Sequence, residues 1–138
     1  MANYWLMKTE PSEYSYDDLV SEKKAVWTGV HNPVALKNIR SMKKGDRAFV
    51  YHTGGEKAVI GIAEIVSEPY PDPKGGDERL AVVDLRPVEK LGSAVTLASI
   101  KADKRFADFL LVRIGRLSVM PVSSDQWNWI LKMGKGKS

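Results

Sequence analysis

Several side chains in this sequence are of the types that recognise a nucleic-acid base. Trp27 comes just before a glycine turn at Gly29, where a ring can project into a cleft. Stacking a base on such a ring contributes about 1–3 kcal/mol. Glu10 follows Lys8 and Thr9, and a carboxylate can accept a hydrogen bond from the exocyclic amine of cytosine or adenine. A core position for Trp27 and a surface position for Glu10 are the alternatives that the residues alone leave open.

Other polar residues also have both a binding and a structural interpretation. Asn32 can contact a base or an anion, but it also has the pattern of a helix N-cap, with Pro33 as the first helical residue. His31 can contact a phosphate or stay exposed. Tyr51 can stack or form a half-buried part of a strand. Arg116 can hold a phosphate through two hydrogen bonds or form a surface ion pair.

The elements that position these residues follow from hydrophobic spacing and from the turn residues. Four helices are predicted: one capped by Ser15 and running to about residue 24, one over residues 33–42, one capped by Thr96 and running to residue 101, and a last one capped by Ser123 or Ser124. Strands are predicted at residues 4–7, 47–52, 57–67, 80–86, 110–114 and 118–122, with residues 47–67 forming a hairpin.

Two further expectations concern local packing. Val34, Leu36, Ile39 and Met42 form the predicted apolar face of the second helix. Residues 68–76 contain three prolines and two glycines and are predicted to be irregular. Five or six strands with short helices inserted between them indicate an α+β fold built on a closed or nearly closed mixed β-barrel.

Composition excludes several classes of protein. The 138 residues suit a single domain, with residues 133–138 expected to form a flexible tail. Since cysteine is absent, there are no disulfides, thiolate metal sites or cysteine nucleophiles. No apolar run is long enough for a membrane span, and the N-terminus lacks a signal-peptide pattern. A cytoplasmic monomer is expected, or a nuclear one in a eukaryote, and the net charge of +4 suits a polyanionic partner.

The sequence carries no recognised catalytic motif. It has no P-loop, zinc helix, nucleophile elbow or dinucleotide fingerprint, so we expect no cofactor, no metal and no enzyme activity. The alternative is a small hydrolase acting on a nucleic-acid component, in which His52 pairs with Glu10 or Asp72. Another alternative is a binder of small nucleotide metabolites that has no polymer partner.

Seven segments and one tryptophan, in order, resemble the EVE domain family. They are residues 5–11 (WLMKTEP), 27–32 (WTGVHN), 42–46 (MKKGD), 51–53 (YHT), 61–65 (GIAEI), 70–73 (YPDP) and 116–122 (RLSVMPV), followed by Trp127. The resemblance implies a PUA-like fold related to YTH domains, which read modified RNA bases. It also implies a binder of a modified or flipped base of DNA or RNA, with Trp27 at the position of the YTH cage tryptophan. Trp5 fits the core or the pocket floor.

The resemblance gathers the candidate residues into one expected pocket. Its members are Lys8, Thr9, Glu10, Trp27, Val30, His31, Asn32, Tyr51, His52, Thr53, Arg116, Leu117 and Ser118. Three positions depart from the usual family motif Trp-Asp-Gly-Val-Arg-Asn-Tyr, because Thr28, His31 and Pro33 replace an acid, an arginine and a tyrosine. If these side chains line the rim, ligand choice can differ from that of relatives.

Overall fold

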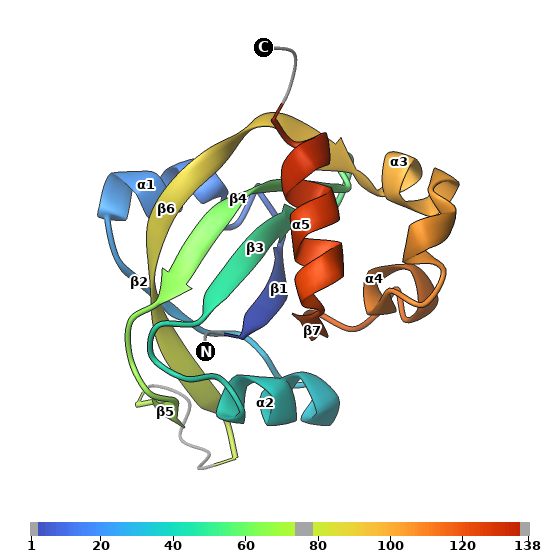
Figure 1. Ribbon diagram of the computed structural model, residues 1–138. Helices are drawn as coiled ribbons and strands as arrows, with labels where there is room; N and C mark the ends of the chain where they lie inside the picture. The colour runs from blue at the N-terminus through green and yellow to red at the C-terminus, as the bar shows by residue number, and fades with distance from the viewer. Residues whose placement is uncertain (1–2, 74–78, 136–138) are drawn as a thin grey trace.

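A mixed β-sheet, curled into a half-barrel, forms the centre of the molecule (Figure 1). The computed structural model describes residues 3–73 and 79–135. The strand order is β2 (Ala25–Trp27), β6 (Ala81–Thr96), β4 (Ala58–Ile65), β3 (Arg47–His52), β1 (Tyr4–Thr9) and β7 (Val119–Val122). β1 and β3 are parallel, and the other neighbours are antiparallel. The predicted α+β mixed barrel is confirmed, with β2 and β7 as the edge strands of a sheet that is not closed.

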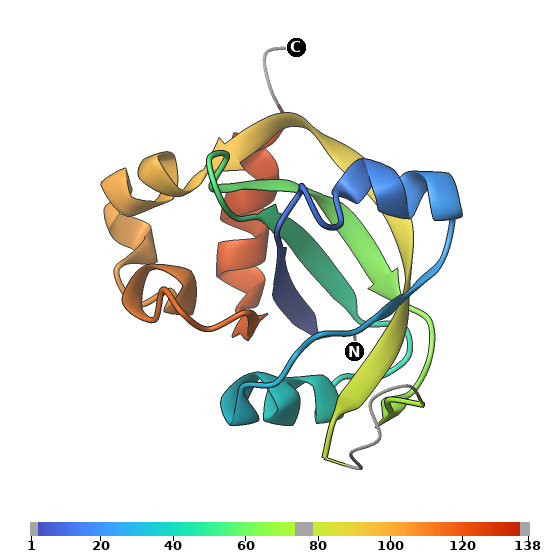
Figure 2. The same cartoon turned by 180° about the vertical axis from the view of Figure 1, so that it is seen from behind.

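Strand β6 is 16 residues long and wraps around the sheet, pairing with both β2 and β4 (Figures 1 and 2). The curvature of the sheet coincides with two register shifts in the pairing of β4 with β6. Between these shifts lies Gly61, on whose backbone the Tyr16 ring packs so closely that an added Cβ would lie 2.5 Å from Cζ of the ring. The Tyr16 hydroxyl donates to the carbonyl of Ile62 at 2.7 Å. Because Tyr16 is the first residue of helix α1 (Tyr16–Glu22), this bond fixes that helix against the sheet.

The α-helices are α1 (Tyr16–Glu22), α2 (Pro33–Arg40), α3 (Leu97–Ala102), α4 (Leu110–Arg113) and α5 (Ser124–Met133), with a 3-10 turn at Lys104–Phe106. Four of the five α-helices begin at the predicted caps, and α4 is the exception. The side chains of Ser15, Asn32, Thr96 and Ser123 each accept from a backbone N–H in the first turn of the following helix. These capping predictions are confirmed.

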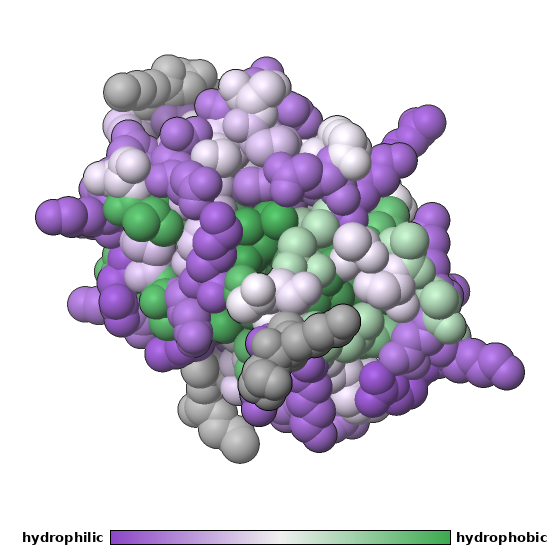
Figure 3. All heavy atoms as spheres, turned by 90° about the horizontal axis from the view of Figure 1, so that it is seen from above, coloured by the Kyte–Doolittle hydropathy of each residue, from purple (hydrophilic) through white to green (hydrophobic). Residues whose placement is uncertain are grey.

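Helix α5 packs against the sheet through stacked aromatic rings. The Trp127 ring lies 3.8 Å from the Phe49 ring and 4.4 Å from the Tyr4 ring, in near-parallel arrangements. Trp129 instead contacts Phe106 edge-on at 5.5 Å. Both tryptophans are therefore packing residues. Seen from above, apolar residues gather near the middle of the face and hydrophilic residues surround them (Figure 3).

A buried carboxylate secures the start of the sheet. Asp46 is only 2% exposed, and its oxygens accept from the Trp5 indole N–H and the Asn3 amide at 3.0 Å and from the Lys43 amide at 2.9 Å. Trp5 thus belongs to the core and does not line the pocket described below.

Four local predictions are wrong in whole or in part. Residues 110–114 form helix α4, not a strand, and the strand expected at 80–86 runs on to Thr96. Within the segment expected to be irregular, Tyr70–Pro71 form strand β5, which pairs with β6. Pro71 has no backbone N–H to donate, and an edge strand tolerates its absence. Val34 is 55% exposed because it lies on the outer side of the first turn of α2.

Some expectations fall partly outside the described residues. Residues 74–76 of the segment expected to be irregular lie there, as do residues 1–2 and 136–138. Of the expected tail, Met133 is the last residue of α5, and the carbonyl of Gly134 accepts from the Ser93 amide at 2.9 Å. Residues 133 and 134 are therefore part of the fold.

Candidate functional site

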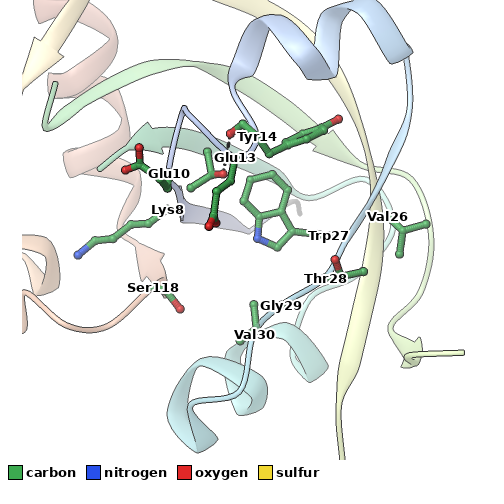
Figure 4. A pocket seen from close by; sticks show the side chains of 11 residues that line it. Lys8, Glu10, Glu13, Tyr14, Val26, Trp27, Thr28, Gly29, Val30 and Ser118 are labelled. Carbon is green, nitrogen blue, oxygen red and sulfur yellow. Dashed lines mark hydrogen bonds between the residues drawn. The ribbon is translucent and has the colours of Figure 1, made fainter. Parts of the chain in front are cut away.

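A pocket of about 300 Å³ opens beside Trp27, between the end of β1 and the loop after β2 (Figure 4). We call it the Trp27 pocket, and its lining residues are Lys8, Thr9, Glu10, Glu13, Tyr14, Val26, Trp27, Thr28, Gly29, Val30 and Ser118. Six of the thirteen candidates lie together here: Lys8, Thr9, Glu10, Trp27, Val30 and Ser118. They come from three separate segments of the chain, so the fold itself brings them together.

Trp27 combines the two roles that the sequence left open. Its side chain belongs to the core cluster and is only 6% exposed, and the Tyr14 ring meets it edge-on at 6.3 Å. The part of the indole that is not packed faces the pocket, with its nitrogen on the pocket side (Figure 4). No described residue accepts a hydrogen bond from Nε1 of Trp27. The indole N–H is thus available to a ligand.

The turn after β1 forms one wall of the pocket. The Tyr14 amide donates to the carbonyl of Glu10 at 2.8 Å, and the Thr9 hydroxyl donates to the carbonyl of Tyr14 at 2.7 Å. One carboxylate oxygen of Glu10 accepts from the Ser12 hydroxyl and amide, and the other accepts from the Thr53 hydroxyl. The bonds from Ser12 hold the pKa of the Glu10 carboxyl below its ordinary value. Glu10 therefore closes the turn, and both of its oxygens already have donors.

Glu13 offers the carboxylate that Glu10 does not, and sequence reasoning missed it. Its side chain is exposed, has no partner among the described residues and points into the pocket beside Trp27 (Figure 4). The signal that could have found it is the sequence Glu10-Pro11, since a turn there brings residue 13 back toward the strand end. Tyr14, also missed, is held by its hydroxyl against Glu22. Burial, with that hydrogen bond, raises the pKa of Tyr14 well above its ordinary value.

Lys8 lies at the boundary of the pocket. Its ammonium donates to the carbonyl of Gly115 at 2.7 Å and lies 5.6 Å from the centre of the Tyr51 ring. Burial lowers the pKa of Lys8 from its ordinary value. The Lys8 amide donates to the carbonyl of Ser118 at 2.9 Å, which brings Ser118 to the pocket.

Two candidates have structural contacts instead. His52 is buried, its Nε2 accepts from the Tyr16 amide at 2.9 Å, and its Nδ1 lies 3.0 Å from Glu56. Its ring nitrogens thus meet Tyr16 and Glu56, and Glu56 takes the place that the hydrolase alternative gave to Glu10. Asn32 lies outside the pocket, where its side-chain oxygen accepts from two amides of α2.

The remaining candidates are dispersed. His31 lies in a separate hollow with Leu36 and Arg40. Tyr51 and Thr53 line a neighbouring pocket, which shares Lys8 with the Trp27 pocket. Leu117 is buried in the core, and Arg116 is exposed outside both pockets. Six candidates thus line the Trp27 pocket, Tyr51 and Thr53 line its neighbour, and the other five lie outside both pockets.

Replacing Asn32 by alanine is expected to lower the free energy of unfolding by about 1 kcal/mol, because the first turn of α2 loses its cap. Urea unfolding followed by circular dichroism measures this. Asn32→Asp keeps an acceptor at the cap and should remain close to wild type. Equal stability of Asn32→Ala and wild type would contradict the capping role.

Among residues 3–73 and 79–135, no group of three or more His, Asp or Glu side chains is placed to hold a metal ion. In the same residues, no helix combines the length and the apolar character that crossing a bilayer requires.

Comparison with known proteins identifies the family of this fold. Residues 3–133 match the model of the EVE domain. The chain belongs to the EVE domain family. Mouse thymocyte nuclear protein 1 is 29% identical over an alignment 167 residues long. The alignment covers 96% of this EVE domain chain and 74% of the mouse protein.

Solved structures agree with this assignment. The NMR structure of a Rhodopseudomonas palustris protein is 43% identical, with a TM-score of 0.91 over 96% of this EVE domain chain and 93% of that one. The crystal structure of human THYN1 protein, solved in complex with 5-methylcytosine-containing DNA, is 25% identical, with a TM-score of 0.88 over 99% and 100% of the two chains. The resemblance seen in the sequence and the PUA-like fold that it implied are confirmed.

Proposed function

We propose that this EVE domain binds nucleic acid by taking one flipped, modified base of DNA or RNA into the Trp27 pocket. Its similarity along the whole chain to human THYN1, solved with 5-methylcytosine-containing DNA, makes such DNA the first ligand to test. The observation that carries the proposal is the pocket itself, where an indole with a free N–H and the unpaired carboxylate of Glu13 line about 300 Å³. That volume is at the small end of ligand sites and suits one base.

Each wall of the pocket has a role in this proposal. Trp27 stacks on the base, its in-plane N–H donates to an acceptor beside the ring, and Glu13 accepts from an exocyclic amine. Val26 is 45% exposed beside the pocket and offers apolar contact to a methyl group on the base. The hydroxyls of Thr28 and Ser118 line the pocket and can bind the remaining polar edge.

Of the three positions that depart from the family motif, only Thr28 lines this pocket. His31 and Pro33 line the separate hollow beside Leu36. The acid that relatives usually carry at position 28 is therefore missing from the pocket, while the changes at 31 and 33 lie away from it. We propose that Thr28 sets any difference in ligand choice from relatives.

A binding screen tests the proposal. Purified protein is titrated into matched DNA and RNA oligonucleotides that carry one unmodified or modified base, and binding is followed by fluorescence anisotropy at several salt concentrations. We expect one modified base to bind at least tenfold more tightly than its unmodified counterpart. Tight binding of the free nucleoside, with weak and salt-insensitive binding of every oligonucleotide, would instead favour a binder of small nucleotide metabolites.

Glu13→Gln is expected to weaken binding of amine-bearing bases by roughly fivefold, since a hydrogen bond to a charged group is replaced by one to a neutral amide. The same change should leave binding of a thymine-type base, which lacks the amine, nearly unchanged. Glu10→Gln is the matched control, because the oxygens of Glu10 are already occupied by Ser12 and Thr53. If Glu10→Gln weakened binding of amine-bearing bases and Glu13→Gln did not, Glu13 would not be the residue that accepts from the amine.

The proposal includes no catalytic step, no metal and a monomeric protein. The absence of a catalytic step is supported by the contacts of His52 with Tyr16 and Glu56, since they leave no histidine in the Trp27 pocket. Incubation of labelled oligonucleotides and nucleosides with the protein should leave them intact. Turnover that is lost in His52→Ala would overturn this part of the proposal.

A further inference from the structure

A second pocket, of about 270 Å³, lies on the other side of Lys8 from Trp27. We call it the Lys57 pocket. The residues that matter in it are Lys8, Tyr51, Thr53, Lys57, Leu97 and Lys101. They come from the ends of β1 and β3, the turn before β4 and helix α3. Because Lys8 lines both pockets, one bound nucleotide can contact both.

The lining of the Lys57 pocket is positively charged. It includes three lysines and no carboxylate. Lys57 and Lys101 are exposed, and neither forms an ion pair with a described residue. The nearby carboxylates have other partners, since Glu56 pairs with His52 and Glu10 accepts from Ser12 and Thr53. The positive charge of this pocket is therefore available to an anion.

The backbone of Lys57 is strained at this position. Its φ is 44°, in the left-handed region where glycine is the unstrained residue. The conformation is held because the carbonyl of Lys57 accepts from the Leu97 amide at 2.7 Å and Ala58 pairs with Thr96. The turn thus places a cation at the pocket where a glycine would fit the backbone better.

We propose that the Lys57 pocket binds the phosphodiester backbone beside the base that occupies the Trp27 pocket, an inference that rests on the proposed function. Lysine ammonium groups act as point charges for phosphate oxygens. The hydroxyl of Thr53 is taken by Glu10, whereas that of Tyr51 has no partner among the described residues and can donate to a phosphate. Leu97 provides an apolar wall for a sugar. The two pockets are adjacent, since Lys8 lines both. A backbone phosphate next to a flipped base lies within one nucleotide of it, so it can occupy the neighbouring pocket.

The test is the salt dependence of binding by a Lys57→Ala, Lys101→Ala double variant. The probe is a fluorescein-labelled single-stranded DNA with one 5-methylcytosine, titrated between about 50 and 200 mM salt. Each phosphate contact contributes about 0.7 to the slope of log K against log salt, so the slope should fall by about 1.4. Affinity for the free 5-methylcytosine nucleoside should stay unchanged.

Lys43→Ala, Lys44→Ala is the matched control, since it removes the same charge from exposed lysines outside both pockets. A slope that is unchanged in the double variant, or that falls equally in the control, overturns the phosphate site. If nucleoside binding persists in these cases, the base-binding proposal survives. If the wild-type protein binds neither oligonucleotide nor nucleoside, both proposals fail.

A single variant separates charge from folding. Lys57→Gly relieves the left-handed strain while it removes the ammonium group. Its melting temperature should be close to that of wild type, and its salt slope should fall by about 0.7. A wild-type slope in this folded variant would contradict a phosphate contact by Lys57.

Discussion

Trp27→Ala is expected to weaken binding of a 5-methylcytosine oligonucleotide at least tenfold. The loss corresponds to about 1.4 kcal/mol, within the range for a base stacked on an aromatic ring. The indole also donates the free N–H that faces the pocket, so the variant loses a donor together with the stacking surface. Fluorescence anisotropy with a matched unmodified oligonucleotide measures the change.

Because Trp27 is also packed in the core, the alanine variant needs a companion. Truncation of a buried tryptophan costs about 3–5 kcal/mol of stability. Trp27→Phe retains an aromatic ring but not the N–H, so its affinity should lie between those of wild type and Trp27→Ala. Trp129→Phe, at a half-buried position of α5 outside the pocket, should bind like wild type. A folded Trp27→Ala or Trp27→Phe protein with wild-type affinity would show that the ring does not hold the base.

Asp46→Ala is expected to lower the free energy of unfolding by about 2–4 kcal/mol. The carboxylate accepts from Trp5, Asn3 and Lys43, and each buried donor that loses its acceptor costs about 1–3 kcal/mol. The Trp5 indole N–H is buried, so the loss of its acceptor carries the full cost. The two amides are part-buried and can be partly hydrated, so they cost less. Urea unfolding monitored by tryptophan fluorescence measures the change.

Asp17→Ala is the control for loss of a carboxylate. Asp17 pairs with Lys90 at the surface, and its side chain is 76% exposed, so its removal should cost less than about 1 kcal/mol. Equal midpoints for Asp46→Ala and Asp17→Ala would mean that the buried carboxylate does not secure the first strand.

Much of the fold could be predicted because local signals agreed with tertiary packing. The four helix caps and the hairpin of β3 and β4 needed only sequence patterns. The apolar run at residues 110–114 could not be assigned, since a short run of this kind suits a strand or a buried helix equally. The extension of β6 past Pro87 could not be predicted, because proline usually ends a strand. Here a register shift in the pairing with β4 accommodates Pro87 opposite Ala63.

The candidate site was predictable only where a motif and the strand ends coincide. Lys8, Thr9 and Trp27 meet because β1 ends where the loop after β2 passes. The structural role of Glu10 could not be predicted, since one of its oxygens accepts from the hydroxyl of Thr53, 43 residues away. The structural use of His52 likewise depends on a contact with Tyr16, at the start of α1. Such long-range partners leave no local pattern in the sequence.

The two walls of the Trp27 pocket are held unequally by the sheet. β1 is paired on both sides, with β3 and β7, whereas β2 is a three-residue edge strand that pairs only with β6. Amide hydrogens of β1 should therefore exchange slowly with solvent, and those of β2 should exchange through low-energy local opening. In the proposed complex, the Lys8 side of the pocket would bind the base with little further loss of conformational entropy. The Trp27 side would adjust to the thickness and substituents of the base, so in the proposed complex we expect β2 to set the tolerance for related bases.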